Sequence, residues 1–206
     1  MKLKKIASLA LAGIMAVSML AGCSTSGNNG NDDPVVTPPA DNSFAASINA
    51  ELSDSQKAIV TFEADSKLTS ALNSVADKFD SDVLANANSS WQKGQVVEDF
   101  RDMMGAEANV GFGDEFKNKN TKDTTAASIM IIPGELTEKG MIKKAADQID
   151  DFINSTTLPN ESGDHKYRYA YTGSVAYVKV ESLNGNVSAY VVGVVVNQSV
   201  TETANT

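Results

Sequence analysis

Three tyrosines at a two-residue spacing form the strongest candidate binding surface in this sequence. Tyr167, Tyr169 and Tyr171 fall in a stretch rich in aromatic and β-branched residues. Alternate residues of a strand point to the same side of a sheet, so the three rings should share one face. With Trp91 they could stack on sugar rings or dock a partner. Packing on the sheet is the commoner use of such rings, and both roles stay open.

One four-residue motif has the spacing of a serine nucleophile and its base. Ser90-Trp91-Gln92-Lys93 resembles the Ser-x-x-Lys motif of penicillin-recognising serine enzymes, in which the lysine lies one helical turn from the serine. No Lys-Thr-Gly motif follows, and the chain is too short for that fold. We therefore predict that this motif lies in a loop between helices and is not catalytic.

The remaining titratable groups favour solvent-exposed roles. His165 is the single histidine, whereas a zinc site takes three or four ligands that are mostly His or Cys. Two groups of acids fall on predicted helices, and a carboxylate pair is sufficient for some hydrolases. Both groups lie on the polar side of their helix, so a solvated face is expected. These acids are Glu98, Asp99, Asp102, Asp147, Asp150 and Asp151.

The first 23 residues have the pattern of an export signal. Lys2, Lys4 and Lys5 precede an apolar run from residue 6 to residue 20, which is shorter than the ~20 residues of a spanning helix. The run ends in Leu20-Ala21-Gly22-Cys23, which resembles the lipobox of bacterial lipoproteins. The resemblance implies a lipid on the sulfur of Cys23 and cleavage between Gly22 and Cys23.

Composition sets the expected organisation of the rest of the chain. The precursor has 17 basic and 26 acidic residues, and loss of the three signal lysines leaves 14 against 26, a net charge of −12. This acidity argues against nucleic acid as a partner. Cys23 is the single cysteine, so no disulfide or cysteine-bound metal is expected. We predict a signal peptide at 1–22, a lipidated cysteine with a disordered tether at 23–43, and one domain at 44–206.

Hydrophobic periodicity predicts an α+β fold. The predicted sheet is mixed or antiparallel with about four strands, its helices pack mainly on one face, and the chain ends in a β-hairpin. Val194, Val195 and Val196 are apolar on both faces, which indicates an interior strand. The predicted strands are 58–62, 128–132, 167–183 and 186–201, and the predicted helices are 44–52, 66–83, 96–104 and one that begins after Thr137.

The hairpin register follows from its turn. Asn184-Gly185 is the strongest short hairpin signal, because both turn positions require residues that tolerate positive φ. A turn there pairs Val180 with Ala189, Val178 with Val191 and Ala176 with Gly193. We expect a bulge or bend at Gly173, where a glycine interrupts the first strand.

These patterns predict a membrane-tethered extracytoplasmic lipoprotein at the outer face of the cytoplasmic membrane. We expect a non-enzymatic interaction or ligand-binding module of the cell envelope, without cofactor or metal, whose partner is an envelope protein or a polysaccharide. The alternative is a small envelope hydrolase that uses a carboxylate pair. A third reading is a solute-capture lipoprotein for a transporter, although such proteins usually need two domains around a cleft.

Overall fold

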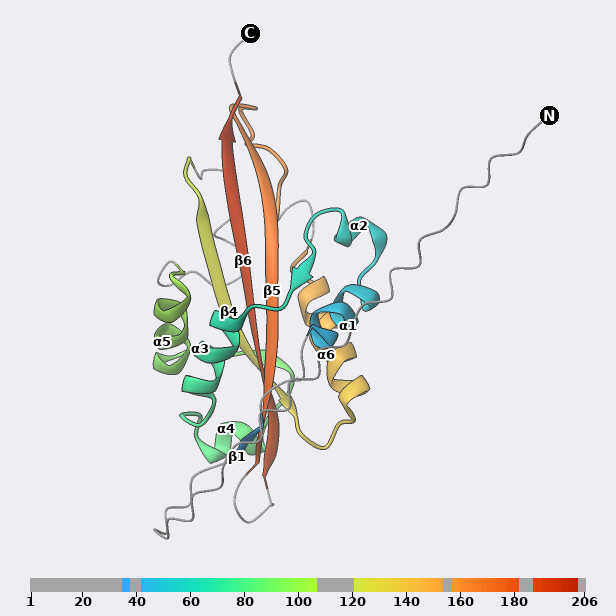
Figure 1. The fold of residues 1–206 in the computed structure, drawn as a ribbon, viewed down its shortest axis with the longest axis vertical. Coiled ribbons are helices and arrows are strands. Elements are labelled where there is room, and N and C mark those ends of the chain that lie inside the picture. Colours follow the sequence, from blue (N-terminus) through green and yellow to red (C-terminus); the bar gives the residue numbers. More distant parts are fainter. Residues whose placement is uncertain (1–34, 38–41, 107–120, 154–156, 182–186, 204–206) are drawn as a thin grey trace, which may run out of the picture. The chain divides into compact units, whose positions relative to one another are not determined.

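The computed structural model describes residues 35–37, 42–106, 121–153, 157–181 and 187–203 (Figure 1). The predicted signal peptide, Cys23 and the Asn184-Gly185 turn lie outside these residues. The helices are α1 (Ser43–Glu51), α2 (Asp54–Lys57), α3 (Ser66–Ala76), α4 (Ser81–Ala85), α5 (Gln95–Met104) and α6 (Glu138–Asp150); the strands are β1 (Val35–Thr37), β2 (Phe62–Glu63), β3 (Ser90–Trp91), β4 (Thr124–Pro133), β5 (Tyr167–Glu181) and β6 (Ser188–Glu202).

The six strands form one mixed sheet, which confirms the α+β prediction. The strand order is β1-β5-β6-β4-β3, and β2 also pairs with the outer edge of β5. All pairs are antiparallel except β2 with β5, which is parallel. The count exceeds the predicted four because β1 and β3 have only three and two residues, too few to give a periodic signal.

The C-terminal hairpin is the longest pairing in the sheet. Strands β5 and β6 pair without interruption from Tyr167↔Glu202 to Glu181↔Ser188. The predicted pairs Val180↔Ala189, Val178↔Val191 and Ala176↔Gly193 are all present. β6 also pairs with all ten residues of β4, so it is an interior strand as predicted.

Helices cover both faces of the sheet, and the prediction that they pack mainly on one face is wrong. One core lies between the sheet and α1 and α6, which we call the α1/α6 face. A second core lies between the sheet and α3, α4 and α5, the α3/α5 face (Figure 1). The reason is visible along β6, where Val192 and Val194 are buried in the first core and Val191 and Val195 in the second. A strand that is apolar on both faces requires cover on both.

The chain crosses from one face to the other at β2. The side chain of Asn49 in α1 pairs with both backbone groups of Phe62: its Nδ2 donates to the Phe62 carbonyl at 2.7 Å, and its Oδ1 accepts from the Phe62 N–H at 2.9 Å. The Phe62 ring, 2% exposed, lies over Gly173 of β5. A Cβ at Gly173 would lie 2.5 Å from Cδ1 of this ring.

The glycine therefore has a different role from the predicted one. The pairing of β5 with β6 continues through Gly173↔Val196, so there is no break in register at this residue. Gly173 is required because its missing side chain leaves room for the Phe62 ring. The contact packs β2 against the edge of β5, and Asn49 links α1 to β2.

The N-terminal boundary of the folded part also differs from the prediction. Residues Val35–Thr37 pair with β5 as strand β1, with Val35 opposite Glu181 and Thr37 opposite Lys179. They lie inside the segment predicted as tether. If Cys23 carries a lipid, the chain between the anchor and the sheet is residues 24–34 and not 24–43.

We expect Gly173→Ala to destabilise the protein by about 1–3 kcal/mol, because the added methyl group overpacks against an aromatic ring. Urea unfolding of the purified protein measures this change. Gly163→Ala is the control, since a Cβ at Gly163 meets nothing within 4 Å. In a Phe62→Leu background the cost of Gly173→Ala should fall. Equal costs for the two glycine substitutions would contradict the proposed contact.

Candidate functional site

A hollow at one end of the sheet, which we call the tyrosine hollow, is lined by two of the three predicted tyrosines. Its volume is about 520 Å³, within the range of small-ligand sites. It lies where the connection from α2 to β2, the segment before β5 and the start of β5 meet. Its walls include Ala58, Ile59, Leu158, Asn160, Tyr169 and Tyr171.

Backbone hydrogen bonds hold the two flanking segments against β5. The N–H of Tyr169 donates to the carbonyl of Asn160 at 2.9 Å, and the N–H of Gly173 donates to the carbonyl of Thr61 at 3.2 Å. These two attachments lie on either side of Tyr171 along the strand. These two hydrogen bonds fix the positions of the walls relative to β5, so the hollow is part of the folded structure.

Tyr171 is fixed within the hollow by its hydroxyl group. The hydroxyl donates to the carbonyl of Pro159 at 2.7 Å and accepts from Nε2 of Gln198 at 3.0 Å. Gln198 is 1% exposed and lies directly opposite Tyr171 on β6. Burial raises the pKa of Tyr171 to about 12, against the opposing effect of the Gln198 hydrogen bond. The phenol is therefore neutral at physiological pH, and the side chain presents an aromatic ring rather than an acid or base.

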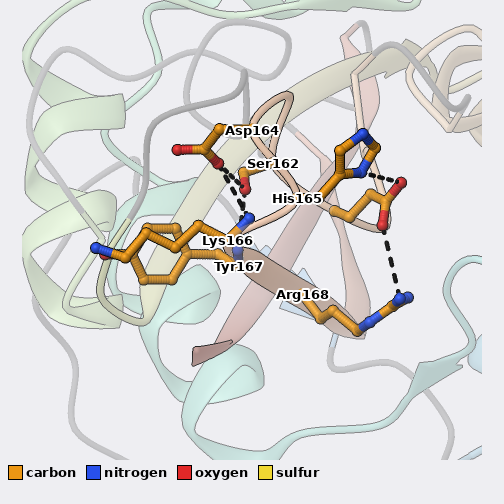
Figure 2. Close-up of polar contacts among 7 residues, drawn as sticks. Ser162, Asp164, His165, Lys166, Tyr167 and Arg168 are labelled. Carbon is orange, nitrogen blue, oxygen red and sulfur yellow. Dashed lines mark hydrogen bonds and ion pairs between the residues drawn. The ribbon is translucent and has the colours of Figure 1, made fainter. Parts of the chain in front are cut away.

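The loop between the hollow and β5 is ordered by a serine and an aspartate (Figure 2). Ser162, 4% exposed, donates its hydroxyl to Oδ1 of Asp164 at 2.5 Å and accepts from the N–H of Tyr167 at 2.9 Å. Oδ1 of Asp164 also accepts from the N–H of Lys166 at 3.1 Å. The hydrogen bond from Ser162 is the main cause that lowers the pKa of Asp164. The loop thus holds the segment before β5 in place.

The predicted aromatic residues do not form one site. Tyr169 is 7% exposed and Tyr171 is half-buried, and both line the hollow. Tyr167 lies on the same side of β5, half-buried, with the Lys166 ammonium 5.3 Å from its ring centroid. Trp91 pairs with Met130, which lies six residues along the sheet from the level of Tyr171, about 20 Å. The structure brings together Tyr169 and Tyr171 and leaves Trp91 outside.

The Ser-x-x-Lys motif is not helical. Ser90 lies in β3 at the sheet edge and not in the predicted loop, and its hydroxyl donates to Oδ1 of Asn88 at 2.5 Å. The spacing places a serine and a lysine together only on a helix, where they are one turn apart. The motif therefore lacks the geometry that a serine nucleophile requires.

His165 lies beside Glu161 in a polar group at the surface. Its side chain is 75% exposed, and its Nδ1 lies 2.9 Å from Oε1 of Glu161. The other Glu161 oxygen lies 3.7 Å from a guanidinium nitrogen of Arg168 (Figure 2). His165 has a positive φ of 59° and is not among the residues that line the hollow. Its position agrees with the predicted solvated loop histidine.

Three of the candidate acids make ion pairs: two of the pairs join exposed side chains, and the third joins Glu98 to an Arg101 side chain that is 8% exposed. Glu98 contacts Arg101 at 2.7 Å, Asp99 contacts Lys78 at 3.9 Å and Asp147 contacts Lys143 at 3.0 Å. A second hollow, of about 550 Å³, has Asp65 in its wall, and this carboxylate caps α3 by accepting from the N–H groups of Lys67 and Leu68. None of the six candidate acids lines the hollow that contains Tyr169 and Tyr171.

No group of three or more His, Cys, Asp or Glu in the described ranges is arranged to hold a metal ion. Within the same part of the chain, no helix has both the length and the hydrophobicity needed to cross a membrane.

Most of the residues that line the hollow were not predicted from the sequence. Ala58 and Ile59 precede Tyr169 and Tyr171 by more than 100 residues, and Leu158 and Asn160 lie in a loop with no periodic signal. The pairing of β2 with β5 brings these segments together.

Comparison of the chain with protein-family models, curated proteins and solved structures found no match.

The raised pKa of Tyr171 predicts a loss of stability at alkaline pH. The ordinary pKa of a tyrosine is 10.0 and that of folded Tyr171 is about 12, so the unfolded state loses this proton first. The stabilisation is complete below pH 10 and is lost as the pH rises to 12. Tyr177, which is also raised to about 12 by burial, adds to the effect.

Urea unfolding from pH 10 to pH 12 tests this prediction. Tyr171→Phe should make the decline in stability shallower than in the wild type, and the double variant with Tyr177→Phe shallower again. An equally steep decline in all three proteins would show that neither phenol is held neutral by the fold.

Proposed function

We propose that this chain is a lipid-anchored extracytoplasmic binding module of the cell envelope. The lipid is attached to Cys23 after cleavage behind Gly22, and the domain lies at the outer face of the cytoplasmic membrane. The domain binds a saccharide unit of an envelope polymer in the tyrosine hollow and performs no catalysis on it.

The anchor is supported by the first 23 residues. A basic start, an apolar run and Leu20-Ala21-Gly22-Cys23 occur in the order that export and lipidation require. Each buried CH₂ of an acyl chain contributes about 0.8 kcal/mol to membrane attachment, so two or more chains hold a protein firmly. A protein anchored in this way needs no spanning helix.

The binding proposal is carried by one observation, the aromatic lining of the 520 Å³ hollow. Tyr171 is neutral and its hydroxyl is already hydrogen-bonded, so the ring is the part of the side chain that can meet a ligand. Ile59 adds apolar surface and the exposed Asn160 side chain is polar, whereas Leu158 lies in the wall but is only 2% exposed. A sugar ring has one apolar face and a polar rim, which matches this combination.

Hydrolysis by a carboxylate pair receives no comparable support. Three of the candidate acids on α5 and α6 are paired with cations: Asp99 and Asp147 at the surface, and Glu98 with the buried Arg101. Retaining and inverting glycosidases both need two carboxyl groups that flank the scissile bond. The described wall of the tyrosine hollow contains no carboxylate.

The anchor is tested by Cys23→Ser in cells that express the full chain. The wild type should incorporate a clickable fatty acid and sediment with membranes, and the variant should lose both properties. Ser24→Cys combined with Cys23→Ser is the matched control, since it restores a thiol one residue outside the lipobox and should not restore labelling. Labelling of the Cys23→Ser variant would refute attachment at this residue.

The hollow is tested by filling it. Ala58→Trp places a large side chain in its wall and should reduce binding to purified envelope polysaccharide by tenfold or more, which is about 1.4 kcal/mol or more. Ala85→Trp is the matched control, because Ala85 is exposed on α4 and does not line the hollow.

Binding is measured by sedimentation with insoluble polymer and by calorimetry with soluble fragments. Equal binding by both tryptophan variants would place the ligand elsewhere. Retention of a single envelope protein with no polysaccharide bound would replace the saccharide by a protein partner.

A further inference from the structure

The pairing of β1 determines which end of the sheet lies closest to the anchor. Val35 pairs with Glu181 at one end of β5, whereas Tyr171 lies at the level of the hollow, ten residues away along the same strand. At ~3.3 Å per residue, this separation is about 33 Å. The folded chain therefore has the tether attached at one end and the proposed binding site at the other.

The average span expected for a tether of this length is shorter than the separation between the two ends of β5. Val35 follows Cys23 by 12 residues, so even a fully extended chain spans only about 42 Å. A random coil of 12 residues spans about 19 Å on average, which is less than the separation of about 33 Å along β5. A tether of 20 residues ending at α1, as the sequence predicts, would allow much more freedom.

Charge also keeps the domain away from the bilayer. The mature chain has a net charge of −12, from 14 basic and 26 acidic residues once the three signal lysines are removed. The surface of an anionic membrane repels such a domain, and the repulsion acts over about one Debye length. A domain held at one end and repelled along its length is favoured in an upright orientation.

We infer that the hairpin end of the sheet faces the membrane and the tyrosine hollow faces away from it. This inference rests on the proposed lipid anchor. The average span of a 12-residue coil, about 19 Å, added to the distance of about 33 Å along β5 gives a distance of about 50 Å between the hollow and the bilayer. The saccharide that it binds therefore comes from the polymer layer beyond the membrane and not from a glycolipid headgroup in the same bilayer.

The experiment uses the full lipidated chain in vesicles that contain an anionic lipid and a fluorescent acceptor on the headgroups. Lipidation occupies the single native cysteine, so one introduced cysteine provides a unique position for a donor dye. Glu181→Cys labels the β1 end, and Thr201→Cys, opposite Arg168, labels the end with the hollow. Both positions are exposed.

Energy transfer from position 181 should exceed that from position 201 severalfold. A variant with 20 Gly and Ser residues inserted after Asn31 should reduce the difference, because a longer tether lets the domain turn over. Equal transfer from the two positions in the native chain, or stronger transfer from position 201, would overturn the inferred orientation. If neither labelled protein floats with the vesicles, the lipid anchor itself fails, and the orientation fails with it.

A competition assay distinguishes the two sources of saccharide. Soluble polymer fragments should bind to the vesicle-bound protein, and a glycolipid with the same saccharide in the same bilayer should not compete. Competition should appear with the inserted tether. Competition by the glycolipid against the native chain would contradict the inference, even if the Ala58→Trp variant had confirmed the hollow as the binding site.

Discussion

The contact of Phe62 with Gly173 is the constraint on which the candidate site depends. Asn49 holds both backbone groups of Phe62, and the absent side chain at Gly173 admits its ring. At this point the chain passes from α1 on one face of the sheet to α3 on the other. The same contact places Ala58 and Ile59 near the edge of β5, where they form one wall of the hollow. The crossing of the chain between the two faces and the wall of the candidate site therefore depend on the same packing interaction.

The parts of the fold that follow from local patterns were predictable. The hairpin register followed from Asn184-Gly185, because a two-residue turn fixes every pair above it. The interior position of β6 followed from its apolar residues on both faces. The same observation requires cover on both faces of the sheet, because the side chains of β6 are buried in both cores.

Long-range packing explains the other differences. The role of Gly173 depends on Phe62, a residue 111 positions earlier, and no local pattern reveals that contact. The apolar stripe at 68–83 predicts one helix, but α3 ends at Ala76 and α4 begins at Ser81. Phe79 is buried in the break itself, so the spacing of apolar residues continued while the helix did not. For the site, alternation predicted that the tyrosines share a face, whereas the walls opposite them come from distant segments.

Tyrosine ring resonances observed during a titration with soluble envelope polysaccharide would test the central claim most directly. The chain has five tyrosines, and all five lie in the described residues, at 167, 169, 171, 177 and 190. The account predicts that the signals of Tyr169 and Tyr171 shift with saturation, while those of Tyr177 and Tyr190, which pack against each other with ring centroids 6.0 Å apart, stay in place. Shifts confined to Tyr177 and Tyr190, or no shifts at all, would contradict it.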